Sequence, residues 1–250
     1  MIKPDIVLSK PWKDKVLLKY YFGRPGWTNG RQQFNRLIEK FIKHGVNILE
    51  IGAGPTNKTT AFLATFGKVT GLDISSKVKS NKYCRETIVY DGIHIPCEAN
   101  YFDVAVSDYV FEHVEHPAKL CYEIHRVLRP GGFYIFRTPN LWHYVSIAGR
   151  LSPYFIHKSV ASRLRDMSSN PQDTYPTFYR MNTKRTCYRI LRQAAFNVDV
   201  IKIIETEPSY GMASPFLFYP LMVWERLLNS SSSFEMFRAN ILCAASADKK

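Results

Sequence analysis

Apolar residues follow two spacings along this chain. Short continuous apolar runs predict buried strands at residues 46–51, 69–72, about 87–90, 103–107 and 133–137. Helical spacing between the runs predicts helices at residues 57–66, 75–84 and 117–128. Because strands and helices alternate, the expected fold is α/β, a Rossmann-like doubly wound sheet.

The flanks of this core carry further predicted elements. Phe34, Leu37, Ile38, Phe41 and Ile42 recur at three- and four-residue intervals between Asn29-Gly30 and Gly45. This spacing predicts a capped amphipathic helix that packs on the sheet. Toward the other end, we expect a helix at residues 183–195 and strands at 197–205 and 239–245.

The first predicted strand ends in Gly52-Ala53-Gly54, and the second ends about 20 residues later at Asp73. A glycine turn and a carboxylate at this spacing are how a βαβ unit binds a nucleoside. A tight turn without a ligand is the alternative.

Residues around the turn distinguish between nucleoside cofactors. The third small position of a dinucleotide fingerprint is Asn57, and Glu50 places a carboxylate just before the turn. A carboxylate there would repel a pyrophosphate but attract a cationic amino-acid moiety. The sequence therefore favours S-adenosylmethionine over NAD.

Four later segments extend the pattern. They contain Asp-Gly-Ile-His-Ile-Pro, Phe-Asp-x-x-x-Ser, Phe-Glu-His-Val and Arg-x-Leu-x-Pro-Gly-Gly, within residues 91–96, 101–107, 111–114 and 123–132. With the glycine turn and Asp73, the chain from about residue 46 to 139 resembles the class I S-adenosylmethionine-dependent methyltransferases, specifically the type 11 (UbiE-like) subfamily.

The resemblance implies a seven-stranded sheet with an antiparallel last strand, and it implies roles for individual residues. Glu50 would serve the turn and the methionine amine, Asp73 the ribose hydroxyls, and Asp91 the adenine amino group, while Ser107, Asp108 and Tyr109 would form the strand end beside the methyl group. Helix or turn capping is the alternative for Asp73 and Asp91. The other implied cofactor-binding residues are Gly52, Ala53, Gly54, Ile74 and Gly92. Thr56 stands where many relatives have a third glycine, and because threonine can still cap a helix start, we expect little effect.

A base is needed only if the methyl acceptor must lose a proton. The candidate catalytic bases are His113, which the resemblance places near the methionine end of the cofactor, and His143 and His157 downstream. A structural role is the alternative for each of them.

The expected organisation is one methyltransferase domain over residues 1–250. It comprises a helical extension at 1–45, the cofactor-binding core at 46–139, and two insertions at 140–181 and 206–237. Both insertions are rich in aromatic residues and follow strands whose ends face the ligand, so we expect them to form a substrate cap. A small second core is the alternative.

Composition adds charge to this picture. Residues 1–44 carry 10 basic and 3 acidic side chains, residues 45–140 carry 10 and 10, and residues 141–250 carry 14 and 8. Basic flanks can attract an anionic substrate, nucleic acid or membrane surface. The five scattered cysteines predict neither a zinc site nor a disulfide framework. The absence of a signal pattern or a long apolar stretch predicts a soluble, cytoplasmic protein.

The expected function is transfer of a methyl group to N or O of a small apolar or aromatic metabolite in specialised biosynthesis, with the oligomeric state open. The closest alternative is a peripheral membrane enzyme acting on a lipid or quinone, because residues 216–224 could seek a membrane surface. A nucleic-acid methyltransferase fits less well, because Ser107-Asp108-Tyr109-Val110 replaces the expected Asn/Asp-Pro-Pro-Tyr/Phe. A non-catalytic nucleotide-binding module is a further alternative.

Overall fold

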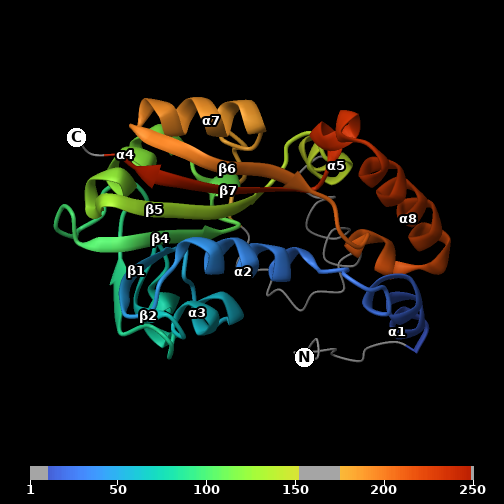
Figure 1. The fold of residues 1–250 in the computed structure, drawn as a ribbon, viewed down its shortest axis with the longest axis horizontal. Coiled ribbons are helices and arrows are strands. Elements are labelled where there is room, and N and C mark those ends of the chain that lie inside the picture. Colours follow the sequence, from blue (N-terminus) through green and yellow to red (C-terminus); the bar gives the residue numbers. More distant parts are fainter. Residues whose placement is uncertain (1–10, 152–174, 249–250) are drawn as a thin grey trace.

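The computed structural model describes residues 11–151 and 175–248, and its centre is a seven-stranded sheet of order β3-β2-β1-β4-β5-β7-β6 (Figure 1). Strands β1 to β5 pair in parallel, whereas β7 pairs antiparallel to both β5 and β6. The predicted doubly wound sheet with an antiparallel last strand is confirmed. The strands are β1 (Val46–Ile51), β2 (Gly67–Asp73), β3 (Glu86–Val89), β4 (Phe102–Asp108), β5 (Leu128–Pro139), β6 (Phe196–Ile204) and β7 (Asn240–Ala247).

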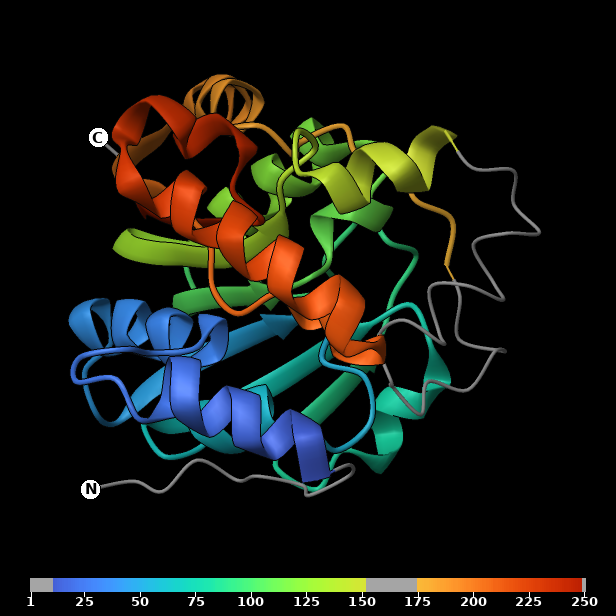
Figure 2. The ribbon, with the colours of Figure 1, turned by 90° about the vertical axis from the view of Figure 1, so that its right-hand side faces the viewer.

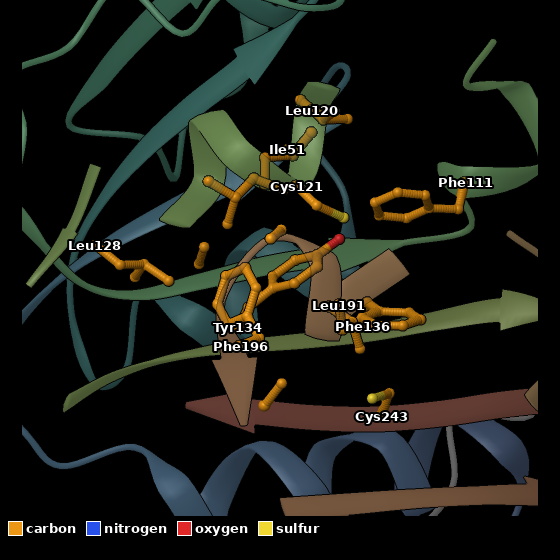
Figure 3. Close-up of a cluster of buried hydrophobic side chains, with 14 of the residues drawn as sticks. Ile51, Phe111, Leu120, Cys121, Leu128, Tyr134, Phe136, Leu191, Phe196 and Cys243 are labelled. Carbon is orange, nitrogen blue, oxygen red and sulfur yellow. The ribbon is translucent and has the colours of Figure 1, made fainter. Parts of the chain in front are cut away.

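Helices cover both faces of the sheet (Figure 1). Buried side chains of α2 (Gly30–Phe41) and α3 (Lys58–Leu63) pack on one face, and those of α4 (Pro117–Val127) and α7 (Lys184–Gln193) pack on the other. Figure 3 shows the second of these cores, where Tyr134, Phe136 and Phe196 lie among aliphatic side chains. Each fully buried side chain of this size contributes about 1.5–3 kcal/mol.

The predicted start of α2 is confirmed by its cap. The Asn29 side chain accepts a hydrogen bond from the backbone N–H of Gln32, and the Gln32 side chain accepts one from the N–H of Asn29. This reciprocal pair satisfies two amides that would otherwise lack a helical partner.

Two local predictions are wrong. Residues 75–84 form only the short 3-10 helix η2 (Ser76–Ser80), because the next residue, Asn81, turns inward and is buried. Thr56 does not cap α3: Asn57 accepts hydrogen bonds from two amides of that helix, while the Thr56 hydroxyl donates to the carbonyl of Ser80.

A second apolar core lies outside the sheet. The N-terminal helix α1 (Pro11–Leu17), the π-helical turn η1 (Leu18–Phe22) and the long helix α8 (Pro215–Ser230) pack together around Tyr21, Met212 and Phe218 (Figure 2). Phe218 of the 206–237 insertion thus contributes to a second core shared with the N-terminal extension, while Phe216, Tyr219 and Trp224 of the same insertion are exposed. Of the 140–181 insertion, the structure describes α5 (Tyr144–Leu151) and residues 175–181, and residues 152–174 lie outside the described part.

Three short 3-10 helices complete the described elements: η3 (Phe111–His113), η5 (Ser209–Ala213) and η6 (Ser232–Phe237). Over residues 11–151 and 175–248, no helix combines the length and apolar character that crossing a bilayer requires.

Candidate cofactor and acceptor site

The carboxyl ends of β1, β2 and β3 meet at one edge of the sheet, as parallel strands must. Gly52 and Gly54 have φ angles of 71° and 55°, which only glycine adopts without strain. A Cβ atom on Gly52 would lie 2.4 Å from Cγ2 of Val110. The glycine turn after β1 is therefore required both by backbone conformation and by the close approach of the segment after β4.

Two asparagines fix the shape of this turn. Asn57 Nδ2 donates to the carbonyl of Ala53, and Asn57 Oδ1 accepts from the N–H groups of Thr59 and Thr60. The amides at the start of α3 are thus already satisfied by protein, which leaves them unsuited to a dinucleotide pyrophosphate. Asn81 Nδ2, buried under the turn, lies 2.9 Å from the Thr60 hydroxyl and 3.3 Å from the Ala53 carbonyl oxygen.

Glu50 is buried directly before the turn. Its side chain bonds with Thr60, but Oε2 has no hydrogen-bond partner among the described residues. Burial raises the pKa of Glu50 to about 8, and the nearby carboxylates of Asp108 and Asp73 add to the shift. A cationic group placed against Oε2 would supply the missing partner and lower that pKa again.

Asp73 ends β2 and faces the glycine turn. Its Oδ2 accepts a hydrogen bond of 2.9 Å from the N–H of Gly54, and its Oδ1 accepts one of 2.8 Å from the N–H of Ser75. Asp73 therefore holds the turn, as the capping alternative expects. Its side chain also lines the pocket described below, so the two roles are compatible.

Asp91 follows β3 and is fully exposed. Its Oδ1 accepts hydrogen bonds from the N–H groups of Ile93 and His94, which lower the pKa of the carboxyl. This is an Asx turn, which presents Asp91 and Gly92 on a fixed loop. Ile74 follows β2 and is half exposed. Its side chain lies beside the same loop, since a Cβ atom built on Gly92 would lie 3.4 Å from Ile74 Cγ2.

A pocket of about 290 Å³ joins these strand ends to the segment after β4. This volume is close to the lower end of small-ligand sites. The residues that follow the first three strands contribute two carboxylates and apolar side chains to the lining; they are Gly52, Asp73, Ile74, Tyr90, Asp91, Gly92 and Ile93. The rest of the lining comes from residues later in the chain, namely Val110, His113, Val114, Glu115, His116 and Phe178.

His113 lines the second side of the pocket. Its Nδ1 lies 2.8 Å from the carbonyl oxygen of Pro176. A carbonyl only accepts, so Nδ1 carries the proton of the neutral ring and Nε2 is left with a lone pair. Burial lowers the pKa of His113, which keeps the ring neutral near pH 7. This arrangement suits a base or a hydrogen-bond acceptor.

The three residues expected at the end of β4, Ser107, Asp108 and Tyr109, do not line the pocket. Ser107 is fully buried, and its hydroxyl lies 2.7 Å from that of Tyr134, away from the pocket lining. Asp108 forms a two-pronged ion pair with Arg137, with both N···O distances 2.7 Å. The Tyr109 ring covers the Arg137 guanidinium at 4.5 Å. These side chains shape the strand end rather than line the pocket.

The other two candidate histidines fall elsewhere. His143 is buried, with Nε2 3.6 Å from Oε2 of Glu205 at the end of β6. Burial lowers the pKa of His143 to about 4 and raises that of Glu205 to about 8, so both groups are neutral near pH 7. Neither lines the pocket. His157 lies outside the described residues.

Several residues of the site escape sequence reasoning. Asn81 and Phe178 lie on segments without a motif, and Phe178 reaches the pocket because its N–H donates to the carbonyl of Glu112. The available signal for Asn81 was its position near the end of a predicted helix, where an asparagine side chain often bonds to the backbone. Phe178 belongs to the aromatic-rich insertion at 140–181 that we expect to form a substrate cap, but the sequence does not distinguish it from the other aromatic residues there.

Comparison with known proteins agrees with this geometry. Residues 49–136 match the family described as "Methyltransferase domain". A probable S-adenosylmethionine-dependent methyltransferase of Mycolicibacterium smegmatis is 31% identical over 125 residues, which is 46% of this chain and 49% of that protein. The chain spans about half the length of the curated relatives it matches first.

Solved structures share the fold at low identity. Geranyl diphosphate C-methyltransferase from Streptomyces coelicolor, solved with Mg²⁺, geranyl diphosphate and S-adenosyl-L-homocysteine, has a TM-score of 0.54 and 14% identity, covering 87% of this chain and 79% of its own. The [4+2]-cyclase SpnF has a TM-score of 0.56 and 16% identity, covering 90% and 84%. Residues 49–136 thus match a methyltransferase domain, and the chain has the Rossmann-like fold of these solved structures.

Proposed function

Because residues 49–136 match a methyltransferase domain, we propose that the whole protein is an enzyme that transfers a methyl group from S-adenosylmethionine to N or O of a small apolar or aromatic metabolite. The observation that carries this proposal is the pocket, which joins the strand ends that would bind the nucleoside to a neutral histidine. The finer placement in the UbiE-like subfamily is part of the same proposal.

The residues present fit the cofactor. The buried, unpartnered Glu50 Oε2 suits a cationic amino group, which would turn an unfavourable buried carboxyl into an ion pair. Asp73 offers carboxylate lone pairs to ribose hydroxyls, and Asp91 offers them to an adenine amino group. Ile74 supplies an apolar surface beside the Asp91 loop. When bound, the cofactor supplies a methyl group already activated by a sulfonium.

The chain's remaining task is to place the acceptor and to remove its proton where necessary. His113 would accept that proton at Nε2, because Nδ1 is held by the Pro176 carbonyl. Val110, Val114 and Phe178 give this side of the pocket an apolar lining that restricts water. His143 and Glu205 lie outside the lining and would then have a structural role.

The test is an assay with methyl-labelled S-adenosylmethionine and a panel of aromatic and apolar amines, phenols and acids, read by mass spectrometry of the products. We expect one chemical class to gain the label. The similar fold of a [4+2]-cyclase means that fold alone does not fix the reaction. Tight cofactor binding with no labelled product from any acceptor class, lipids and quinones included, would support a non-methylating role.

His113 gives the assay an internal check. We expect His113→Gln to lower kcat for acceptors that must lose a proton, while the dissociation constant of the cofactor stays the same. Acceptors that are already deprotonated should be much less affected. Equal loss for both kinds of acceptor would assign His113 to structure rather than to proton removal.

A further inference from the structure

Helix α8 buries its acid and exposes most of its large apolar side chains. The acid, Glu225, accepts hydrogen bonds from Tyr21 and Asn229, while Arg226 donates to the carbonyl of Tyr20. Phe218 and Leu228 are buried, but six other large apolar side chains of the helix are exposed. We call them the α8 face: Phe216, Leu217, Tyr219, Val223, Trp224 and Leu227.

The exposure of this face is large. Phe216 is 89% exposed and Val223 is 64% exposed, and Leu18 of the adjoining turn η1 is 60% exposed. Scattered exposed hydrophobics are ordinary, but a helix that exposes six large apolar side chains on one face is not suited to water on that side. Such a face needs an apolar partner.

Cations lie on the N-terminal segment beside the face. Segment 11–28 contains the exposed Lys15, Lys19 and Arg24 and the buried Lys13, against one acid, Asp14. The exposed Lys15 and Lys19 lie three residues before and one residue after Leu18 on the same helical stretch. The Lys19 ammonium is 5.1 Å from the centroid of the Tyr20 ring, and that ring is 6.3 Å from the Tyr219 ring on α8. Positive charge therefore lies directly beside the apolar face.

We propose that the α8 face, with Leu18 and its flanking lysines, docks on an anionic lipid bilayer. Apolar side chains would enter the boundary between head groups and acyl chains, while Lys15 and Lys19 remain at the level of the anionic head groups. Charge argues against a second copy of this chain as the occupant, since pairing two such faces would bring like charges together.

The location of the face gives docking a consequence. Helix α8 follows the carboxyl end of β6, so it lies at the sheet edge that also carries the pocket (Figures 1 and 2). A docked molecule would hold this edge toward the membrane, where an apolar acceptor concentrates. Docking itself does not depend on the proposed methyl transfer.

The experiment is flotation of the full chain with vesicles. Phosphatidylcholine vesicles containing about 30% phosphatidylserine should carry the protein upward, pure phosphatidylcholine vesicles should carry much less, and raised salt should weaken the binding. The double variant Phe216→Ser, Val223→Ser should lower partitioning about tenfold or more. The variant Lys15→Glu, Lys19→Glu should abolish the preference for phosphatidylserine.

Tyr188→Ser, an equally polar change at an exposed aromatic on α7, is the matched control and should float like the original protein. S-adenosylmethionine binding and the melting temperature verify that each variant is folded. Flotation that the α8 variants do not change, or no flotation at all, would overturn the proposal. Concentration-dependent dimers that the Phe216, Val223 variant abolishes, without vesicle binding, would assign the face to a second copy. Failure of methyl transfer would leave the flotation result unaffected.

Discussion

At the scale of single residues, Glu50 combines burial with an unpartnered oxygen. Burying a carboxyl in this way costs free energy unless the group stays protonated, and its raised pKa of about 8 expresses that cost. Residues that weaken the folded protein in this way concentrate at sites where a ligand restores the missing partner.

We expect cofactor binding near pH 7 to release about one proton from Glu50, because the amino group of the cofactor pairs with the ionised carboxylate. Affinity should therefore rise with pH up to about 8. Calorimetry in buffers of different ionisation enthalpy measures the released proton. Glu50→Gln should abolish the release and weaken binding of S-adenosylmethionine, but not of methylthioadenosine, which lacks the amino group. Equal weakening for both ligands would contradict the pairing.

Asp73→Ala should weaken cofactor binding by about 1.5–3 kcal/mol, the range for hydrogen bonds to a charged group. The same change frees the N–H of Gly54 and Ser75, so part of the loss would come through the turn. Adenine alone, which has no ribose, separates the two contributions. If adenine binding falls as much as S-adenosylmethionine binding, Asp73 acts on the turn and not on the ribose.

Sequence reasoning located the pocket-lining residues that belong to motifs, including Gly52, Asp73, Asp91 and His113. It did so because a turn or a strand end fixes each of them locally. Asp108 was expected beside the methyl group but is held by Arg137, from a strand whose pairing partner is specified only by the folded sheet. Contacts between distant segments are the ones that local patterns omit.

At the scale of elements, the strands of the core were predicted to within a few residues, because strands buried on both faces are continuous apolar runs. The helix expected at residues 75–84 was shortened by Asn81, whose side chain turns under the glycine turn. Helix α8 packs against the N-terminal helix, about 200 residues away in sequence. The apolar pattern of either segment alone does not predict that the two pack together.

We expect α8 and the α1–η1 segment to open as one unit, because both depend on Phe218 and Tyr21, which lie with ring centroids 6.2 Å apart. Phe218→Ala, which removes a fully buried ring, should cost about 3–5 kcal/mol within this second core. Hydrogen exchange by mass spectrometry should then show faster exchange in both segments and unchanged exchange in β1 and β4. Faster exchange in α8 alone would show that the two segments open independently.

At the scale of the whole molecule, buried acids make stability depend on pH. The pKa values of Glu50 and Glu205 are raised to about 8 and that of Glu207 is also raised, all mainly by burial. In the folded protein Glu50 and Glu205 keep their protons up to about pH 8, whereas in the unfolded chain they lose them above about pH 4.5. The free energy of unfolding therefore decreases as the pH rises from 4.5 toward 8. The lowered pKa values of His113 and His143 make the free energy of unfolding increase with pH, but only below about pH 6.5.

Between pH 6.5 and 8 we therefore expect the free energy of unfolding of the ligand-free protein to fall. Each acid contributes a slope of at most about 1.4 kcal/mol per pH unit. Urea unfolding at several pH values measures this slope, and Glu205→Gln should flatten it. A stability that rises with pH across this window would show that these carboxyls are ionised in the folded protein.

The antiparallel strand β7 lies between β5 and β6, although it is synthesised after both. A chain emerging from the ribosome can therefore pair β3, β2, β1, β4 and β5 first, with α7 and β6 already made but without a place in the sheet. Until β7 emerges, β5 exposes an unpaired edge with a core strand's apolar side chains, a template for pairing with another nascent chain. Emergence of β7 closes that edge, which makes synthesis of Asn240–Ala247 the step that protects this fold from aggregation.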